Sequence, residues 1–319
     1  MRIGLDIMGG DYAPLEITLG ALLAQPLLTE VRLVLIGSES AARKIITENQ
    51  GNPANFDFVN SIDVIEMHEH PAKAFQQKPN SSISIGFHLL KEGKIDAFCS
   101  AGNTGAMLVG SMFSVKTIQG IMRPAISTLV PKEKGGYGLL LDVGVNADCK
   151  PENLQQFAML GSLYAEHVCH IPNPKVALMS IGEEDEKGNV LTQAANQLLK
   201  NTSGINFVGN VEGRDLFNDK ADVIVCDGFT GNIMLKLAES FYSLTTKRKL
   251  KDEYFDKFNF ESYGGTPILG VNGTVMIAHG ISNATAVKAM LVLTHEVVAA
   301  QLPQKIASAI ASQVPQANQ

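Results

Sequence analysis

Short runs of apolar residues recur along the chain, and most of them lead into a loop rich in Gly, Asn, Asp or Glu. The clearest is the run 139–141, which is followed by Asp142 and a polar loop that reaches Lys150. Pro151 suits the first turn of a helix, because its missing N–H would have no partner there. Apolar residues then recur at helical spacing, at Leu154, Phe157, Ala158, Gly161, Ala165 and Val168. The pattern therefore predicts a strand, a polar loop and a helix.

Other stretches show the same succession of an apolar strand and a polar loop, at residues 3–11, 96–107, 176–189, 206–215 and 222–236. In open α/β sheets, ligands bind outside the carboxyl ends of the strands. A largely parallel sheet would therefore bring all these loops to one rim, and we predict the functional site there. Taken alone, the loop after residue 141 is equally consistent with a solvated turn that caps a helix.

The rest of the chain supplies further elements. Strands are expected at 31–36, 56–59, 64–67, 125–130 and 273–278, and helices at 14–23, 40–48, 84–90, 105–115, 190–200, 214–217, from Asn232 and from Asn283. A turn at 132–137 favours an antiparallel pair, 68–82 reads as a polar connection and 263–273 as a glycine-rich loop. Pro303 is expected to interrupt the closing helix before a polar tail. Without a clear linker or repeat, we expect one domain over residues 1–319, with a helical projection at 236–262.

Composition excludes several classes of protein. The chain has 319 residues, of which 45% are hydrophobic, and a formal net charge of −6. This balance supports a large core and argues against nucleic-acid binding, which needs a basic face. The cysteines lie far apart without zinc-site spacing, so we expect reduced thiols in a cytoplasmic protein. Residue 1 leads directly into a strand and no apolar run approaches the ~20 residues of a membrane span, so neither a signal peptide nor a transmembrane helix is expected.

The sequence lacks the motifs of nucleotide cofactors and of activated serines, namely GxGxxG before a helix, GxxxxGK[ST] and GxSxG. We therefore expect no cofactor. His68 and His70 resemble a metal-binding pair most closely, but they lack further ligands at suitable spacing, so we expect no metal. Cys149 could carry an acyl group, although no histidine lies nearby in sequence to act as its base. His279 ends a strand and is better placed for function, with a structural role as the alternative.

The rim offers neutral hydrogen-bond donors and a few cations instead. The segments 102–105 and 231–232 are expected to open helices, where backbone N–H groups and the helix dipole favour anions. Lys150, Arg214 and Lys236 add positive charge. These features suit phosphate. Helix capping by Asn and Thr is the alternative reading, and it uses the same geometry.

Several motifs, in order along the chain, are similar to those of one known family. They are MGGD at 8–11, AGNTGA at 101–106, RPA at 123–125, DVGVNADCKPENL at 142–154, IGEEDEKGN at 181–189, GNVEGRD at 209–215, DGFTGN at 227–232 and YGGTPILGVNG at 263–273. Over nearly its whole length, the sequence resembles the acyl-carrier-protein:phosphate acyltransferases of bacterial phospholipid synthesis. The resemblance implies that acyl carrier protein (ACP) donates a fatty acyl group to inorganic phosphate.

The resemblance also implies a fold and partners. The fold would be a three-layer α/β/α arrangement with a mostly parallel sheet, as in isocitrate and isopropylmalate dehydrogenases and phosphotransacetylase. The expected partners are ACP, inorganic phosphate, a second copy of the chain, and the membrane glycerol-3-phosphate acyltransferase that takes the acyl-phosphate. We therefore expect a cytoplasmic protein with weak peripheral membrane contact.

Two groups of site residues follow from the rim loops together with this resemblance. The residues expected to be catalytic are Asn103, Asp142, Asn146, Lys150, Asn210, Asp227 and Asn232. The residues expected to bind substrate or phosphate are Asp6, Gly9, Gly10, Gly102, Thr104, Glu212, Arg214, Lys236 and His279. A thioester is an activated acyl group and phosphate is already nucleophilic at pH 7. The transfer therefore needs an anion cradle, oxyanion donors and alignment rather than an activated protein nucleophile.

Two other functions remain open at this point. A metal-dependent decarboxylating dehydrogenase on the same fold would need clustered aspartates on a helix and an arginine-rich pocket, which the sequence does not show. A non-catalytic ACP-binding protein would not need so many polar rim loops.

Between Lys236 and Tyr263 the chain is shorter than in many members of the resembled family, where a longer helical pair is linked to membrane association.

A segment near the end of the projection carries a basic cluster beside aromatic residues. Within 245–261, Leu250, Tyr254, Phe255 and Phe258 are expected to form an apolar stripe. Such a stripe beside cations would suit a membrane, ACP or a dimer interface.

Overall fold

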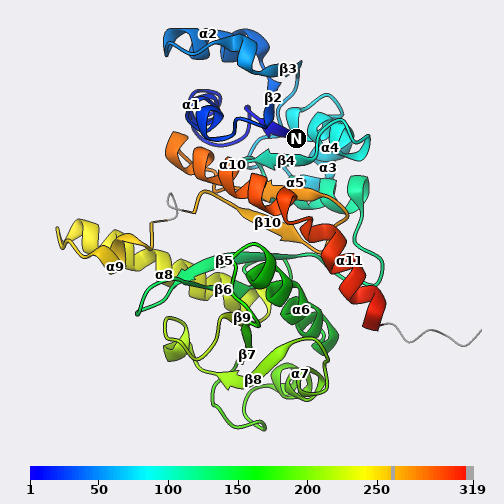
Figure 1. Cartoon of the computed structure of the whole chain (residues 1–319), viewed down its shortest axis with the longest axis vertical. Coiled ribbons are helices and arrows are strands. Elements are labelled where there is room, and N and C mark those ends of the chain that lie inside the picture. The colour runs from blue at the N-terminus through cyan, green and yellow to red at the C-terminus, as the bar shows by residue number, and fades with distance from the viewer. Residues whose placement is uncertain (260–262, 314–319) are drawn as a thin grey trace, which may run out of the picture. The chain divides into compact units, whose positions relative to one another are not determined.

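The computed structural model describes residues 1–259 and 263–313, and the chain divides into two compact units. The first unit comprises Met1–Thr117 and Phe260–Gln301, and the second comprises Ile118–Asn259 and Leu302–Gln319. In both units a mostly parallel sheet is combined with helices (Figure 1). The predicted α/β architecture is therefore confirmed.

The first unit contains a sheet in the order β3-β2-β1-β4-β11-β10. Its strands are β1 (Arg2–Asp6), β2 (Arg32–Gly37), β3 (Asp57–Asn60), β4 (Ala97–Ser100), β10 (Thr266–Leu269) and β11 (Thr274–Ile277). Its helices are α1 (Leu15–Ala24), α2 (Glu39–Glu48), α3 (Pro71–Gln77), α4 (Ser82–Lys91), α5 (Thr104–Gly110) and α10 (Ala284–Ala299), with a π-helical turn at Ser111–Val115. Only β10 runs antiparallel to its neighbour, β11.

Helices cover both faces of this sheet, as neighbouring residues of β4 show. Phe98 points toward α4, where a Cβ at Gly86 would lie 2.1 Å from the phenyl ring. Cys99 points to the other face, and its sulfur lies 3.2 Å from the Thr294 hydroxyl of α10. Both β4 residues are fully buried. The strand is therefore apolar throughout, as expected for a parallel strand between two helical layers.

The second unit contains a sheet in the order β5-β6-β9-β7-β8. Its strands are β5 (Ala125–Pro131), β6 (Tyr137–Leu141), β7 (Lys175–Met179), β8 (Asn206–Val211) and β9 (Val223–Val225). Its helices are α6 (Pro151–His167), α7 (Val190–Lys200), α8 (Gly228–Lys247), α9 (Glu253–Asp256) and α11 (Leu302–Gln313), with a 3₁₀ turn at Gly213–Asp215. β5 and β6 form the predicted antiparallel pair, and the other strands are parallel. The loops that follow β6, β7, β8 and β9 therefore lie along one edge of this sheet.

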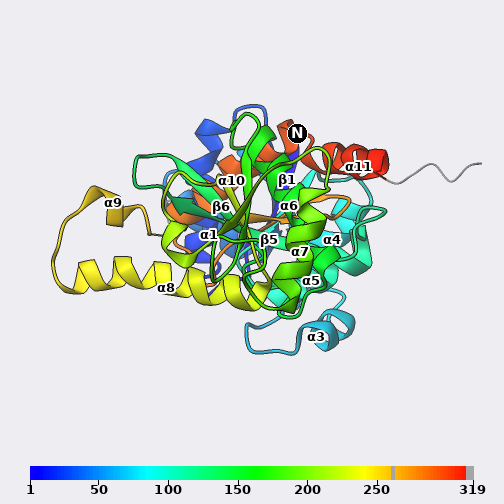
Figure 2. The same ribbon diagram turned by 90° about the horizontal axis from the view of Figure 1, so that it is seen from below.

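An aromatic cluster joins α9 to α8 within the second unit. Phe258 lies 5.2 Å from Phe217, 5.9 Å from Phe241 and 5.4 Å from Tyr254, measured between ring centroids. Phe255 packs against the rings of Phe241, Tyr254 and Phe258, and the Tyr254 hydroxyl donates to the Pro131 carbonyl oxygen at 3.2 Å. Figure 2 shows α9 beside the far end of the long helix α8.

The aromatic cluster overturns the prediction of an apolar surface stripe on residues 245–261. Phe258 is buried, and Tyr254 and Phe255 are half-buried within the cluster, so their apolar surface packs inside the protein. Leu250 alone of the four predicted stripe residues is exposed. The error arose because helical spacing does not say whether an apolar face meets solvent or the protein's own core.

Several predicted elements need local correction. Residues 64–67 form no strand, since only Asp63 makes an isolated bridge, to Ser81. The expected polar connection at 68–82 contains α3, which begins at Pro71. The expected glycine-rich loop at 263–273 contains β10. The predicted interruption near Pro303 is confirmed, because α10 ends at Ala299, but Pro303 lies in the first turn of a new helix, α11, rather than before a polar tail.

Within the described residues, no single helix is both long and apolar enough to cross a membrane. α10 and α11 meet the criteria of length and composition only when they are taken together as a bent pair.

Candidate functional site

A buried carboxylate holds the loop after β6. The two oxygens of Asp142 accept hydrogen bonds from the backbone N–H groups of Ile126 (3.2 Å), Val145 (3.4 Å) and Asn146 (2.6 Å). The side-chain amide of Asn146 donates to Asp142 and to the Pro124 carbonyl oxygen, both at 2.8 Å. Burial raises the pKa of Asp142, although these hydrogen bonds act in the opposite direction. Asp142 and Asn146 therefore fix the loop from inside the protein.

The N-terminus of α8 packs directly on this loop. Its first N–H, from Gly228, donates to the Asn146 carbonyl oxygen at 2.8 Å. Asp227 caps the helix by accepting from the N–H and the hydroxyl of Thr230, both at 2.8 Å. A Cβ at Gly231 would lie 1.9 Å from a carbonyl oxygen of the loop, so glycine is required there. The helix can approach the loop this closely because no side chain separates them.

The prediction that residues 231–232 open a helix is wrong by one turn. The helix starts at Gly228, so Asn232 lies inside it, with its side-chain amide 3.3 Å from the Val143 carbonyl oxygen. Lys236 lies a further turn along, where its exposed ammonium pairs with Glu239 at 2.8 Å. Asn232 thus belongs to the contact between helix and loop, whereas Lys236 lies farther along the helix surface.

Cys149 lies in the same loop but its environment disfavours a thiolate. The thiol donates to the Asn146 carbonyl oxygen at 3.4 Å. Burial, together with the carboxylates of Asp142 and Asp227, raises the pKa of Cys149 to about 11. Because the thiolate is the nucleophilic form, this geometry does not favour an acyl-cysteine intermediate.

Cys149 should accordingly react slowly with alkylating reagents. A pKa of about 11 instead of 9.0 leaves roughly 100-fold less thiolate at neutral pH. We expect iodoacetamide labelling of Cys149 in the folded protein to be about that much slower than in the urea-unfolded chain, and to rise with pH up to about 11. Cys149→Ser should keep its turnover. Rapid labelling at pH 7, followed by mass spectrometry, would contradict this environment.

Two cations border the same loop. The ammonium of Lys150, at the start of α6, is exposed and forms no ion pair within the described part of the chain. Its backbone N–H donates to Asn153 Oδ1 at 2.8 Å, which fixes the backbone but leaves the ammonium available. The exposed guanidinium of Arg123 donates to the Asp148 carbonyl oxygen at 2.9 Å. The loop thus combines an anchored backbone with positive charge at its surface.

The loops after β7 and β8 are tied together by polar contacts. Asn210 is nearly buried, accepts from the Asn196 amide at 2.9 Å and donates to the Glu184 carbonyl oxygen at 2.9 Å. Glu212 and Arg214 form an ion pair with each other at the end of β8. Both polar atoms of the Asn210 side chain are therefore engaged, and they tie the end of β8 to α7 and to the loop after β7.

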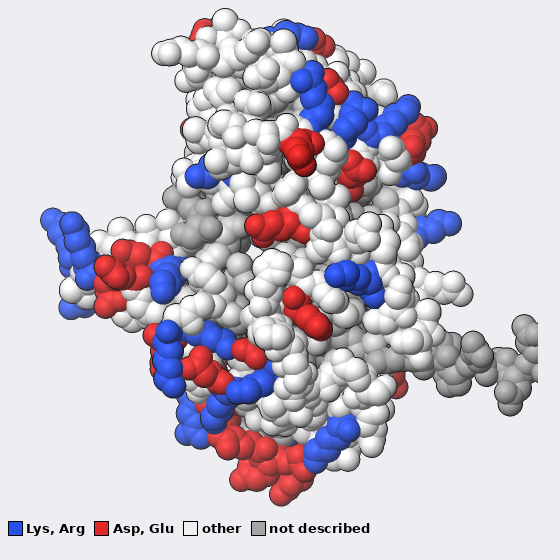
Figure 3. All heavy atoms as spheres, viewed as in Figure 1, with Lys and Arg blue, Asp and Glu red and all other residues white. Residues whose placement is uncertain are grey.

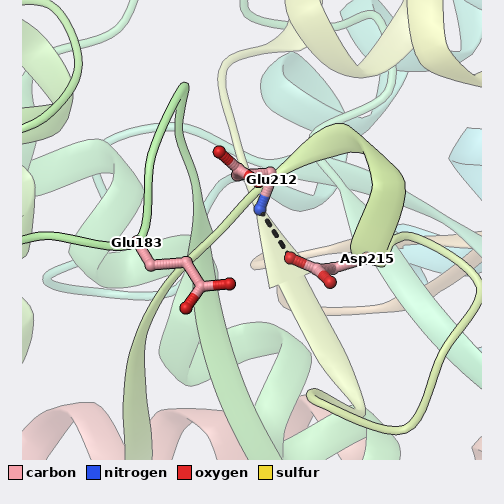
Figure 4. Close-up of side chains that lie close together, drawn as sticks. All are labelled: Glu183, Glu212 and Asp215. Carbon is pink, nitrogen blue, oxygen red and sulfur yellow. Dashed lines mark hydrogen bonds between the residues drawn. The ribbon is translucent and has the colours of Figure 1, made fainter.

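Three carboxylates converge beside these loops, as Figure 4 shows for Glu183, Glu212 and Asp215. Their oxygens lie within 4.8 Å of one another, which is close enough for a shared cation. The ammonium of Lys220 already occupies this position, at 2.6 Å from Glu183 and 2.9 Å from Asp215. Hydrogen bonds to these two carboxylates raise the pKa of Lys220. The cluster is therefore an ion-pair network in which Lys220 and Arg214 offset two of the three carboxylate charges.

In the first unit, a second buried carboxylate organises the loops after β1 and β4. Asp6 accepts from the N–H groups of Met8 (2.9 Å) and Gly9 (3.1 Å), and from the Ser100 hydroxyl (2.7 Å). The Ser100 oxygen in turn accepts from the Gly102 N–H at 2.9 Å. Burial raises the pKa of Asp6, against the effect of these hydrogen bonds. Asp6 therefore joins the two loops rather than facing a substrate.

Glycines allow these two loops to touch. A Cβ at Gly9 would lie 2.7 Å from the Gly102 backbone, and Gly10 has a φ of +105°. The loop after β11, which contains the half-buried His279, joins them through a 2.7 Å hydrogen bond from the Asp11 N–H to the Gly280 carbonyl oxygen. Gly9, Gly10, Gly102 and His279 are thus brought to one edge of the first unit's sheet.

Asn103 caps α5, and both polar atoms of its side chain form hydrogen bonds within the protein. Its carbonyl oxygen accepts from the Ala106 N–H at 3.0 Å. Its amide donates to three backbone carbonyl oxygens, those of Glu66 (3.0 Å), Met67 (3.3 Å) and Glu69 (3.1 Å). Thr104, by contrast, is exposed in the first turn of α5. Asn103 is thereby suited to holding the residue 66–69 loop on α5.

Comparison with known proteins identifies the family. The model of a family described as fatty acid synthesis protein matches residues 1–305. A phosphate acyltransferase of Dictyoglomus thermophilum is 46% identical over 96% of either chain. The chain belongs to the fatty acid synthesis protein family. It is an acyltransferase.

Solved structures support the fold of this acyltransferase. A phosphotransacetylase from Streptococcus pyogenes superimposes with a TM-score of 0.68 at 17% identity, over 94% of each chain. A 4-hydroxythreonine-4-phosphate dehydrogenase from Klebsiella pneumoniae gives a TM-score of 0.53 at 15% identity, over 92% of this chain and 97% of that one. At such identities the similarity concerns the fold alone, and it agrees with the three-layer α/β/α architecture expected from the sequence.

Sequence reasoning missed some residues that build the candidate site region. Gly228 and Thr230 form the start of α8, and the N-cap preference of Asp227 three residues before Thr230 was the available signal. Ser100 links Asp6 to Gly102, and Arg123 borders the Lys150 loop. Arg123 lies within the RPA motif at 123–125, but neither its contact with Asp148 nor the contact of Ser100 with Asp6 could be predicted, because these partners lie far away in sequence.

Proposed function

We propose that this acyltransferase moves a fatty acyl group from acyl-ACP to inorganic phosphate and so supplies acyl-phosphate for phospholipid synthesis. Its relative in Dictyoglomus thermophilum is a phosphate acyltransferase, which supports phosphate as the acceptor. The observation that carries the proposal is the loop of residues 142–150. Its backbone is fixed by Asp142 and its surface carries the free ammonium of Lys150, while its cysteine is held as a thiol.

In the proposed reaction phosphate attacks the thioester directly. An oxygen of hydrogen phosphate forms a bond to the carbonyl carbon, the C–S bond breaks, and the thiolate of the carrier leaves and takes up the proton that the phosphate gives up. Lys150 and Arg123 would attract the phosphate dianion. Amide and backbone N–H groups of the anchored loops would stabilise the developing oxyanion, a contribution that depends on donors already being in place.

The remaining predicted site residues receive positioning roles in this proposal. Four of them would hold the 142–150 loop and the start of α8 in their positions relative to each other, namely Asp142, Asn146, Asp227 and Asn232. Asn103, Asp6 and Asn210 would do the same for their own loops, because their polar atoms are engaged within the protein. Thr104 and His279 remain candidates for direct contact. Glu212 and Arg214, which pair with each other, would shape the edge of the site.

The reaction can be tested by incubating the protein with acyl-ACP and inorganic phosphate. We expect acyl-phosphate, detected by mass spectrometry, to form only when phosphate is present and without added metal or nicotinamide. Lys150→Ala should raise the KM for phosphate, since no carboxylate among residues 1–259 and 263–313 pairs with the ammonium, whereas Lys305→Ala on the exposed face of α11 should not. Equal loss of acyl-ACP without phosphate, or a requirement for NAD, would refute the proposal.

The proposed enzyme acts as a homodimer. One face of α8 carries Phe229, Ile233, Leu237 and Leu244, whose exposed fractions are 63%, 53%, 60% and 53%. Their spacing of four, four and seven residues places them on one side of the helix. A contiguous apolar stripe of this kind commonly marks a protein interface. Light scattering that gives a monomer mass at micromolar concentration would refute the dimer.

The proposed location is the cytoplasm, with weak peripheral membrane contact that brings the product to the membrane glycerol-3-phosphate acyltransferase. Residues 247–251 support such contact through their positive charge. Vesicle sedimentation with and without anionic lipid tests it, and equal recovery in both supernatants would argue against it.

A further inference from the structure

The outer face of α5 and of the π-helical turn that follows it is apolar and exposed. We call Leu108, Val109, Met112 and Phe113 the α5 stripe. Met112 is 48% exposed and Phe113 is 72% exposed, the largest fraction for any aromatic side chain that the structure describes, while the other two are half-buried. Because Leu108 and Met112, like Val109 and Phe113, are four residues apart, each pair lies along one side of the helix.

The α5 stripe lies in an uncharged part of the chain. Residues 97–115 contain no Asp, Glu, Lys, Arg or His, so α5 and the π turn carry no charge. Elsewhere the surface mixes both signs, as Figure 3 shows for one face of the molecule. The neighbouring helix α3 contains Lys73 as its only charged residue. An anion such as phosphate would therefore find no cation on α5, whereas a hydrocarbon chain would displace water from apolar side chains without covering a charge.

Hydrogen bonds fix the helix at both ends of the stripe. At the start, the side-chain oxygen of Asn103 caps α5 by accepting from the Ala106 N–H. At the end, the side-chain amide of Asn272 donates to the backbone carbonyl oxygens of residues 115–117, at 3.1, 3.2 and 2.9 Å in chain order. The apolar face is therefore already formed before a ligand binds, which lowers the entropic cost of binding.

The stripe begins beside the candidate site of the first unit. α5 follows Gly102, whose backbone lies against Gly9, and Thr104 is exposed in the first turn of α5, one turn before the stripe. A Cβ at Gly105 would lie 2.3 Å from Pro71, so α3 packs on the same turn. A ligand whose reactive group lies near Thr104 would extend its remaining length over the stripe.

The dimensions of the stripe suit a fatty acyl chain. From Thr104 to Val115, a helical rise of about 1.5 Å per residue gives roughly 17 Å. The hydrocarbon core of a bilayer is about 30 Å thick and holds two layers of acyl chains, so one chain reaches roughly 15 Å. A stable protein complex uses roughly 20–30 residues on each side, many more than this stripe offers. A helix that binds a bilayer surface typically carries Lys and Arg, which α5 lacks.

We propose that the α5 stripe binds the hydrocarbon chain of the acyl donor, with the thioester near Thr104 and the methyl end near Phe113. This inference rests on the proposed function, which makes a fatty acyl thioester the donor. Contact of the chain with the stripe stabilises the donor complex in proportion to the number of methylene groups that it covers. The stripe thereby makes the enzyme select long acyl chains over short ones.

The test compares two donors that differ only in chain length. In Met112→Ser/Phe113→Ser, we expect kcat/KM for palmitoyl-ACP to fall at least about tenfold, which corresponds to lost contact with about two methylene groups. With butyryl-ACP, whose chain is too short to reach these two residues, kcat/KM should change less than about twofold. The matched control Leu23→Ser/Leu27→Ser removes two side chains of similar exposure, 48% and 62%, from the same unit. It should leave both donors unaffected, and an equal loss with palmitoyl-ACP would contradict the inference.

A photoreactive donor locates the chain directly. Palmitoyl-ACP with a diazirine at the methyl end should label residues 112–115 on illumination, as mapped by peptide mass spectrometry. Labelling confined to residues 229–244 would place the chain on α8 and overturn the inference.

The outcomes separate this inference from the proposed function. If the unmodified protein forms no acyl-phosphate from palmitoyl-ACP and phosphate, the proposed function fails and this inference fails with it. If acyl-phosphate forms and Met112→Ser/Phe113→Ser keeps the same preference for palmitoyl-ACP, the inference alone is wrong, including the case in which this variant loses only its dimer mass or its binding to vesicles. An equal loss with both donors also overturns it, because the substitutions then act on the fold or on the chemical step.

Discussion

Asp142→Ala is expected to lower turnover about 100-fold and to destabilise the protein by at least about 3 kcal/mol. The substitution leaves the N–H groups of Ile126, Val145 and Asn146 without their acceptor in a buried position. Each buried donor left unsatisfied costs about 1–3 kcal/mol. The loop that carries Lys150 would also lose its fixed position, and small misplacements of catalytic groups are costly.

Steady-state kinetics and urea unfolding measure the two effects of Asp142→Ala. Asp148→Ala is a matched control, because this carboxylate lies in the same loop but is exposed. We expect its stability to change by less than about 0.5 kcal/mol. Asp142→Asn keeps the shape of the side chain and one acceptor oxygen, so its turnover and its stability should lie between those of Asp142→Ala and Asp148→Ala. Normal kinetics and stability in Asp142→Ala would show that other contacts hold the loop.

Gly231→Ala is the second substitution with a large expected effect. The added Cβ would lie 1.9 Å from the Asp142 carbonyl oxygen and 2.9 Å from the Cys226 sulfur. Because both neighbours are buried, α8 has to move away from the loop, and overpacking of this kind costs about 1–3 kcal/mol or more. We expect turnover to fall by roughly 100-fold, because the start of α8 and the Lys150 loop separate.

Gly213→Ala provides the matched control for Gly231→Ala. Gly213 lies in the same unit, and a Cβ there would meet no atom within 4 Å. Its turnover and melting temperature should remain near those of the unmodified protein. If Gly231→Ala behaves like this control, the tight contact between α8 and the loop is not required for activity.

The sequence was sufficient to predict most of the strands and the polar loops at their carboxyl ends, although β10 was missed and residues 64–67 form no strand. Apolar runs such as 139–141 stand out because buried parallel strands are apolar on both faces. The first turn of α8 was missed because Gly228 and Gly231 resemble loop residues, although in the fold they permit close packing on Asp142. α3 was missed because it is a short helix inside a polar segment.

The roles of individual side chains were harder to predict than the elements. Asn103 lies where the sequence placed it, but its amide binds carbonyl oxygens more than thirty residues away in the chain. Likewise, the aromatic residues near 254 have helical spacing that does not reveal Phe217 as their partner. Such partners depend on tertiary packing, which a local pattern does not encode.

The aromatic cluster also has a consequence for the dynamics of the projection. α9 spans only Glu253–Asp256, too short to be stable as an isolated helix. Its order therefore depends on ring contacts with Phe217 and Phe241. When those contacts open, α9 and the residues 250–252 that precede it should lose their structure together. The amide hydrogens of residues 250–258 would then exchange with solvent as one cooperative unit, at a lower free energy than global unfolding.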